Sequence, residues 1–381
     1  MAWKWKYSPK DQLEDMSSLH PGLTGLQNLE NTCYMNAVLQ CLCSLTPFVQ
    51  YFLSGKWNAA LHEEIGESAI AFGCLVSDMW LGEFDFVSPE AFHSVFGKRY
   101  PAFSRRTQHD AQEFLICVLD DLHEAFKQVR AQLWCFGNYS CFLCLPCPHV
   151  FLPSRATDKE LFKQLTLSNP SQERQSSAAG ASTRSSSGTS IITHLFEGQL
   201  SYAIRCLTCR ALSDRPESFT ILSLPIPSTR MCSLQDCLEC FFQPDTLTRN
   251  NQIHCYWCGS NRDATVKASI TKAPQIIIFH LKRFAWQDKH RRKLSTTVCY
   301  PFSDLDLSPY ISPSCHNNTE YSLCAVVNHA GDLDYGHYTA FCKHSITKHW
   351  YSFDDAQVTK IPDSAVQADT AYILFYTSQG F

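Results

Sequence analysis

The spacing of hydrophobic residues changes along the chain from a helical to a strand-like pattern. Two early segments place apolar side chains three and four positions apart, which is the spacing of one buried helix face. The first segment begins after Asn31 and the second at Asp110. Their apolar positions are Met35, Val38, Leu39, Leu42 and Leu45 in the first, and Ala111, Phe114, Leu115, Val118, Leu119, Leu122 and Phe126 in the second. We therefore predict one helix from each segment.

Short apolar runs dominate the chain after residue 191. Polar, glycine, proline or aspartate turns separate these runs, as is typical of β-strands. The runs are Ile276–Leu281, Tyr321–Val327, His337–Phe341, Trp350–Phe353 and Tyr372–Tyr376. Helices that come first, with strands following, predict an α+β fold.

Residues 128–190 interrupt this organisation. The cysteine-rich stretch 135–147 leads into SQERQSSAAGASTRSSSGTS, which is rich in serine and short of large apolar residues. Such a composition predicts a disordered insert, because it cannot bury enough apolar surface to fold. Cys141, Cys144 and Cys147 have metal-like spacing, although a site there would need a fourth ligand and a rigid frame. Residues 1–22 are polar and are predicted to form a loose N-terminal tail.

Composition and charge narrow the class of protein. Of 381 residues, 45% are hydrophobic and 18% charged, a globular balance for one elaborate domain or two. The net charge of −4 argues against nucleic acid as the main partner. The N-terminal sequence has no apolar signal-peptide core, and no apolar run approaches the ~20 residues of a membrane span. We expect an intracellular protein of the cytoplasm or nucleus, with no membrane partner, whose twenty cysteines are reduced.

Two pairs of cysteines have the spacing of zinc ligands. Cys206-Leu-Thr-Cys209 and Cys255-Tyr-Trp-Cys258 are separated by 45 residues. Each CxxC pair presents two sulfurs from one tight turn, and two such turns complete a tetrahedral site with no open position. The alternative is four reduced thiols without a metal. A closed site of this kind predicts a structural zinc ion that contributes to folding and not to catalysis.

Another cysteine, Cys33, lies where the first helix is predicted to begin. Asn31 and Thr32 precede it, and both are residue types that cap helices. Free N–H groups and partial positive charge at a helix N-terminus favour a thiolate over a thiol. Cys33 is therefore a candidate nucleophile, and the alternative is that it is one more buried thiol.

A histidine and two carboxylates near the C-terminus could complete a thiol-protease site. His337 follows Gly336, and Asp354 and Asp355 end a predicted strand. Thiol proteases need a cysteine nucleophile, a histidine base and an acid that orients the histidine. Their wide separation in sequence is acceptable because such groups meet in space. Alternatively, His337 is structural and Asp354 caps a turn.

Several blocks of the chain resemble the ubiquitin-specific proteases. GLQNLENTCYMNAVLQ is similar to their Cys box, and YGHYTAF with WYSFDDAQV is similar to their His box. QHDAQEFL, FTILSLPIP, PQIIIFHLKRF and AYILFY also occur in family order. The resemblance implies a papain-like cysteine protease domain over residues 23–378, with the insert 128–190 outside the match. It also implies a helical thumb, a β-rich palm and, over about residues 196–275, zinc-bearing β fingers that hold ubiquitin.

The resemblance implies roles for individual residues. Cys33 resembles the nucleophile, His337 the general base and Asp354 the residue that orients the base. Asp355 would support the site. Asn28, five positions before the thiol, matches the family's oxyanion-hole side chain. The implied reaction is hydrolysis of the bond after the C-terminal glycine of ubiquitin, through a thioester at Cys33.

The block QHDAQEFL resembles the segment that meets the C-terminal tail of ubiquitin. Gln108, Asp110 and Gln112 are the candidate contacts. The carboxylate of Asp110 suits an arginine-rich tail, but an aspartate at a helix start is also a common N-cap. The motifs do not distinguish ubiquitin from related modifiers.

One position departs from the family pattern. The Cys box usually has glycine three residues before the thiol, and this chain has Glu30. A glutamate would be strained there if the backbone has positive φ, and a carboxylate facing Cys33 would disfavour the thiolate. Two functions therefore stay open, a working deubiquitinase and a pseudoenzyme that binds ubiquitin or a partner without turnover. An unrelated zinc-binding adaptor would explain the cysteine pairs but none of the His-box features.

Overall fold

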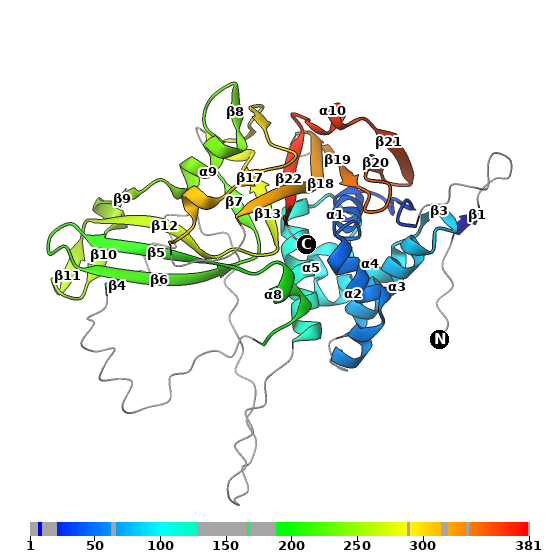
Figure 1. Cartoon of the computed structure of the whole chain (residues 1–381), viewed down its shortest axis with the longest axis horizontal. Helices are drawn as coiled ribbons and strands as arrows, with labels where there is room; N and C mark the ends of the chain where they lie inside the picture. Colours follow the sequence, from blue (N-terminus) through cyan, green and yellow to red (C-terminus); the bar gives the residue numbers. More distant parts are fainter. Residues whose placement is uncertain are drawn as a thin grey trace, which may run out of the picture.

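The computed structural model describes residues 7–9, 21–61, 66–127, 166–167, 188–287, 290–313, 319–332 and 335–379. Three regions follow one another across the molecule (Figure 1). Helices form one end, an eight-stranded sheet lies in the middle, and long antiparallel strands extend to the opposite end. This is the expected arrangement of thumb, palm and fingers, and the α+β prediction is confirmed.

The thumb is built from helices around one apolar core. Its elements are α1 (Cys33–Leu42), α2 (Thr46–Leu53), η1 (Lys56–Ala60), α3 (Glu67–Leu81), α4 (Glu90–Arg99), η2 (Pro101–Ser104) and α5 (Ala111–Phe126). All ten residues of α1 are buried. The helix packs against α5 and also against β18 (Glu320–Gly331) and β19 (Gly336–Lys343) of the palm. The sequence predicted that one face of α1 is buried, whereas the structure buries the helix on all sides.

The second predicted helix, α5, matches its periodicity. Its seven predicted apolar positions are all buried. Asp110 caps the helix by accepting a hydrogen bond from the backbone N–H of Gln112 at 2.8 Å. The short helix α8 (Ile191–Leu195), which was not predicted, packs beside α5 and is capped by Ser190. The described chain thus enters the predicted insert 128–190 twice, at residues 166–167 and from residue 188 onward.

The palm is a mixed sheet with the strand order β21-β20-β19-β18-β22-β13-β7, and β17 pairs with β18 outside this order. The remaining bounds are β7 (Leu222–Leu224), β13 (Ile276–Leu281), β17 (Leu305–Asp306), β20 (Trp350–Asp354), β21 (Gln357–Ile361) and β22 (Ala371–Ser378). All five predicted strands lie in this sheet. One apolar core lies between the thumb helices and the palm sheet. A second apolar core lies between the palm sheet and α9 (Leu234–Phe242). All six residues of β13 are buried.

The fingers form a four-stranded antiparallel sheet with the order β6-β5-β12-β9. Its strands are β5 (Gly198–Cys206), β6 (Leu212–Phe219), β9 (Asp245–Leu247) and β12 (Ala264–Lys272). At the tip, β10 (Ile253–Cys255) pairs with β11 (Ser260–Arg262) and with β4 (Thr166–Leu167). A small third apolar core fills this tip.

The remaining elements border these regions. They are β8 (Met231–Ser233) paired with β16 (Thr297–Cys299), β14 (Phe284–Gln287) paired with β15 (His290–Lys293), η4 (Arg249–Asn251), η5 (Ser308–Tyr310) and α10 (Asp363–Val366). The described part of the predicted loose tail includes the strand β1 (Tyr7–Pro9), which pairs with β3 (Phe84–Val87). Strand β3 also pairs with β2 (Gly25–Leu26). Cys141, Cys144 and Cys147 lie outside the described residues. Among the described helices, none is long and apolar enough to cross a membrane.

Candidate active site and metal site

Cys33 is the first residue of α1, as the sequence predicts, but its thiol does not have the expected low pKa. The side chain is buried, and this burial raises the thiol pKa above its ordinary value. Hydrogen bonding from the backbone of Tyr338 in β19 opposes the rise, while the carboxylate of Asp355 adds to it. The backbone N–H groups of Cys33 and Tyr34 at the start of α1 lower the thiol pKa, as expected of a helix N-terminus, but desolvation outweighs them in the free protein.

His337 and Asp354 form the shortest polar contact of the site. Nε2 of His337 lies 2.6 Å from Oδ1 of Asp354, and both side chains are about half exposed. The contact arises because His337 is the second residue of β19 while Asp354 is the last residue of its antiparallel neighbour β20. With Nε2 engaged by the carboxylate, Nδ1 is the nitrogen left to accept a proton. His337 is followed in sequence by Tyr338, whose backbone hydrogen-bonds with the Cys33 thiol and lowers its pKa.

The backbone just before His337 is held from two sides. A Cβ atom at Gly336 would overlap the ring of His329, so the glycine is required by close packing. Gln108 forms two hydrogen bonds with the same residue. Its Nε2 donates to the carbonyl of Gly336 at 3.2 Å, and its Oε1 accepts from the Gly336 N–H at 3.3 Å. Gln108, a predicted tail contact, therefore reaches across from the thumb and fixes the strand that carries His337.

Asp355 is the centre of a second polar cluster. Its Oδ2 accepts from Nδ2 of Asn28 at 2.8 Å, and its Oδ1 accepts from Nδ2 of Asn36 at 2.8 Å. Its carbonyl accepts from the N–H of Leu26 at 2.8 Å, and its backbone is left-handed, with φ at 50°. The structure thus brings Asn28 to Asp355. Asn36 was missed from sequence, although an asparagine one turn after Cys33 in an apolar helix is a detectable signal.

Asp110 serves first as a helix cap. Besides the bond from Gln112, its carboxylate accepts from the hydroxyl of Tyr372 at 2.8 and 3.0 Å. Burial raises the pKa of this carboxyl, and these hydrogen bonds oppose the rise. The side chain of Gln112 is partly exposed next to it. Tyr372 was not recognised from sequence, since its strand is 262 residues away from Asp110.

Glu30, which stands where the family usually has glycine, has the positive backbone φ that we considered from sequence. Its φ is 73°, and Asn31 beside it has a φ of 54°. Its side chain is exposed, however, and the carboxylate that raises the Cys33 pKa is that of Asp355. The strain argument therefore holds, and the argument from a carboxylate facing the thiol does not.

The four predicted zinc ligands meet at the fingertips. The Sγ atoms of Cys206, Cys209, Cys255 and Cys258 all lie within 4.8 Å of one another. Two of the separations are 4.0 Å, from Cys206 to Cys258, and 3.5 Å, from Cys209 to Cys255. A tetrahedral Zn²⁺ with Zn–S bonds of about 2.3 Å has S–S edges of about 3.8 Å. The thiols therefore fit a closed four-sulfur zinc site.

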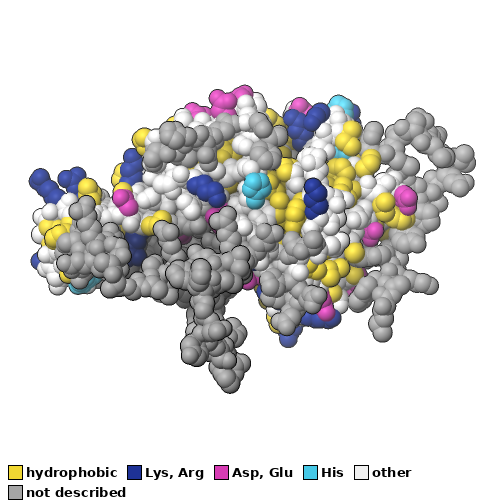
Figure 2. Space-filling model, turned by 60° about the horizontal axis from the view of Figure 1, so that its bottom comes forward, with side chains coloured by type: hydrophobic (Ala, Val, Ile, Leu, Met, Phe, Trp, Pro, Cys, Tyr) yellow, Lys and Arg dark blue, Asp and Glu magenta, His cyan; other side chains and the backbone are white. Residues whose placement is uncertain are grey.

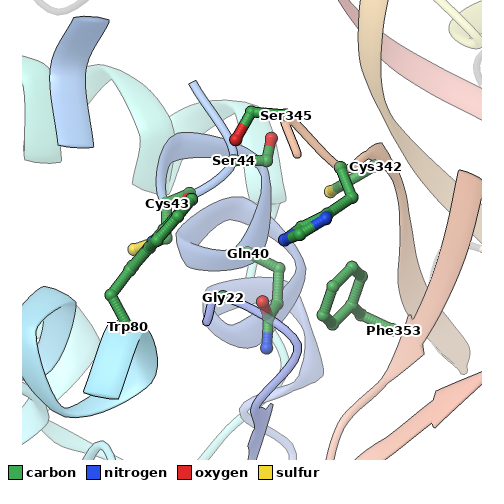
Figure 3. A pocket seen from close by; sticks show the side chains of 9 residues that line it. Gly22, Gln40, Cys43, Ser44, Trp80, Cys342, Ser345 and Phe353 are labelled. Atoms are coloured by element: carbon green, nitrogen blue, oxygen red, sulfur yellow. The ribbon is translucent and has the colours of Figure 1, made fainter. Parts of the chain in front are cut away.

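A small pocket lies away from these groups (Figure 3). Gln40, Cys43, Trp80, Cys342 and Phe353 are among the side chains around it. The lining residues come from the end of α1 distant from Cys33, from α3, from the far end of β19 and from β20. Its volume of about 10 Å³ leaves room for about one water molecule, so it is not a substrate site.

Comparison with known proteins identifies the family. The family model described as ubiquitin carboxyl-terminal hydrolase matches residues 24–376. The chain belongs to this family. It is 35% identical over 373 residues to ubiquitin carboxyl-terminal hydrolase 2 of Gallus gallus, covering 94% of each chain. It is 33% identical to ubiquitin carboxyl-terminal hydrolase 2 of Rattus norvegicus, with 93% of this chain aligned to 54% of that protein. The chain thus spans about half the length of the rat relative.

Solved structures share the fold at lower identity. One is the SAGA DUB module Ubp8/Sgf11/Sus1/Sgf73 bound to ubiquitin aldehyde, with a TM-score of 0.69, 23% identity and coverage of 97% of this chain and 72% of that one. The same module bound to monoubiquitin gives a TM-score of 0.70 at 23% identity, with 97% and 72% covered. The thumb, palm and fingers described above are therefore the architecture of the ubiquitin-specific protease domain.

Proposed function

We propose that the chain is a deubiquitinating cysteine protease that hydrolyses the bond after the C-terminal glycine of ubiquitin. The contact of 2.6 Å between His337 Nε2 and Asp354 Oδ1 carries this proposal. It orients the imidazole so that Nδ1 is free to accept a proton. The next residue of the same strand, Tyr338, forms a backbone hydrogen bond with the Cys33 thiol. Family membership and the bound ubiquitin of the two structural neighbours support the same substrate.

The chemistry follows from these positions. Nδ1 of His337 accepts the thiol proton as the Cys33 sulfur attacks the glycine carbonyl carbon. When the C–N bond breaks, the imidazolium returns this proton to the leaving amine and a thioester stays on Cys33. Water then attacks the thioester, again with His337 as base. The N–H groups at the start of α1 and the amide of Asn28 are the nearby donors for the oxyanion.

The alternative is a protein that binds ubiquitin or another partner and turns over slowly. Two observations favour it. Burial raises the pKa of the Cys33 thiol, and the Asn28 amide is already engaged by Asp355 at 2.8 Å. The thiol pKa would have to fall when substrate enters, since a positive imidazolium favours the thiolate, and the oxyanion would have to accept from the second N–H of the Asn28 amide.

A structural zinc ion at the fingertips is part of this proposal. Cys206, Cys209, Cys255 and Cys258 would hold it, and four sulfur ligands leave no position for substrate. Bound zinc would supply a cross-link between β5 and β10 rather than reactivity. Its binding energy would stabilise the fingers, whose apolar core at this end is small.

Reaction with a ubiquitin C-terminal electrophile separates the two functions. A deubiquitinase should gain the mass of one ubiquitin at Cys33, and Cys33→Ser should stay unmodified. A binding protein should show saturable ubiquitin affinity by calorimetry without the covalent adduct. Neither an adduct nor affinity, in folded protein, would refute both candidates.

A further inference from the structure

Large apolar side chains are exposed where the fingers end. Leu207 lies within the first CxxC turn and is 48% exposed, and Tyr256 and Trp257 lie within the second at 45% and 49%. The two aromatic rings are 6.4 Å apart and edge to face. Leu212, just after the first turn, is 66% exposed. Because the cysteines of both turns meet, these side chains belong to one tip, the fingertip surface, formed by residues 205–212 and 246–264.

Positive charge accompanies these apolar side chains. The fingertip surface contains four arginines and one carboxylate, that of Asp263, in a chain with net charge −4. The carboxylate accepts a hydrogen bond from Gln252 at 2.8 Å. All four arginines are exposed, and none forms an ion pair with a described residue; they are Arg205, Arg210, Arg249 and Arg262. Figure 2 shows Lys and Arg side chains beside hydrophobic ones at this end of the molecule.

Two of these arginines occupy backbone positions that favour glycine. Arg210 has a φ of 60° and Arg249 a φ of 54°. Arg210 directly follows the first CxxC turn, and the matching position after the second turn is Gly259, with a φ of 64°. The same turn is thus built once with glycine and once with arginine. Strained conformations of this kind are retained where the side chain has a use.

We propose that the fingertip surface docks an acidic segment of a partner protein whose carboxylates flank aromatic or aliphatic side chains. Arg, Tyr and Trp are the residues that most often dominate binding energy at protein interfaces. Guanidinium groups that form no ion pair with a described residue offer forked donors that match carboxylates, and the exposed rings and leucines offer apolar contact. The partner binds at the zinc-bearing tip of the fingers, where β5, β6, β9 and β12 end.

Two other ligands could occupy the fingertip surface, the insert of this chain and single-stranded nucleic acid, and charge argues against both. The predicted insert of this chain, residues 128–190, carries six Lys and Arg against three Asp and Glu, so it does not supply an acidic segment. Single-stranded nucleic acid would stack on the aromatic rings, but it needs a cationic groove that follows its backbone. Four arginines at one tip and exposed leucines fit a short acidic and apolar peptide better.

Fluorescence anisotropy of a labelled 12-residue peptide, with glutamates around two phenylalanines, tests the proposal on the full chain. Its control is the same peptide with glutamine in place of glutamate. We expect the glutamate peptide to bind at least tenfold more tightly. Arg210→Gly should weaken its binding by roughly three- to tenfold, and Trp257→Ala by about tenfold. Arg210→Gly should leave the melting temperature unchanged or raised, because it relieves the left-handed strain.

Lys348→Gly is the matched control, since Lys348 is an exposed cation with a φ of 60° in the palm, outside the fingertip surface. It should leave peptide affinity unchanged. Ubiquitin affinity, measured by calorimetry, should be the same in Arg210→Gly and wild type, and this result separates the fingertip proposal from the proposed function. Equal binding of both peptides, no binding of either, tighter binding of a dT12 oligonucleotide, or a parallel loss of ubiquitin affinity in Arg210→Gly would each overturn it.

Discussion

Asn28 donates its side-chain amide to Asp355 over 2.8 Å, across 327 positions of sequence. Asp355 therefore has two opposing effects on the site. It orients the amide that matches the family's oxyanion donor, and its negative charge raises the pKa of the Cys33 thiol. The two effects can be separated because one concerns hydrogen-bond geometry and the other concerns charge.

Asp355→Asn should make Cys33 easier to alkylate while slowing turnover. Removal of the carboxylate favours the thiolate, so the alkylation rate with iodoacetamide should rise at a lower pH than in wild type. An asparagine cannot accept from both Asn28 and Asn36 as the carboxylate does, so cleavage of a ubiquitin C-terminal amide should slow by about 10- to 100-fold.

Asp354→Asn is the charge-matched control for that experiment. It removes an equal charge from the neighbouring position but leaves the bonds from Asn28 and Asn36 in place. If both variants shift the alkylation profile equally, a general loss of negative charge explains the result and the specific role of Asp355 is wrong.

Gln108 should act mainly on the position of His337. Gln108→Ala removes both hydrogen bonds to Gly336, so kcat should fall about tenfold with little change in KM. A pure contact with the ubiquitin tail would instead raise KM. Gln112→Ala makes the same substitution four positions along in the same block and should leave kcat unchanged. Steady-state kinetics with a ubiquitin C-terminal amide distinguish these outcomes.

One zinc ion per chain should be found by metal analysis of the purified protein. Cys258→Ser should abolish it and lower Tm by roughly 4–5 °C, the shift for a loss of about 3 kcal/mol in a domain of this size. Cys240→Ser replaces an exposed cysteine outside the four-sulfur group and should preserve both metal content and Tm. Zinc-free wild-type protein with normal Tm would contradict the site.

Local patterns predicted those parts of the fold that local physics determines. The α5 stripe and the five palm strands follow from periodicity, and the CxxC pairs follow from the geometry of a tight turn. The burial of Cys33 could not be predicted, because it depends on β19 packing over α1. Gln108 and Gly336 are 228 residues apart, and no spacing rule joins them.

The same limit applies to Asp110. Sequence allowed both a cap and a ubiquitin contact, and the structure shows the cap together with the bond from Tyr372. Asp110→Arg would break both interactions, so any loss of ubiquitin affinity in that variant would include a loss of folding. Calorimetry on this variant is informative only alongside a measured Tm.

Glu30→Gly should stabilise the protein without changing the thiol. With a φ of 73°, the residue is in the left-handed region, where a side chain costs about 1–2 kcal/mol and glycine loses part of this gain through its greater chain entropy. A net gain of about 1 kcal/mol corresponds to a rise in Tm of roughly 2 °C. Because the carboxylate is exposed, the pH profile of Cys33 alkylation should stay the same.

Lys348→Gly is again the matched control, because it relieves similar strain at a φ of 60° outside the Cys box. Both variants should gain stability, but only Glu30→Gly can alter turnover, through the loop that sets the position of Asn28. A faster cleavage rate with an unchanged alkylation profile would mean that backbone strain limits the oxyanion site. Alkylation of Glu30→Gly at a lower pH than wild type would instead show that the carboxylate reaches the thiol in solution, and the assignment of Asp355 as the acting charge would be wrong.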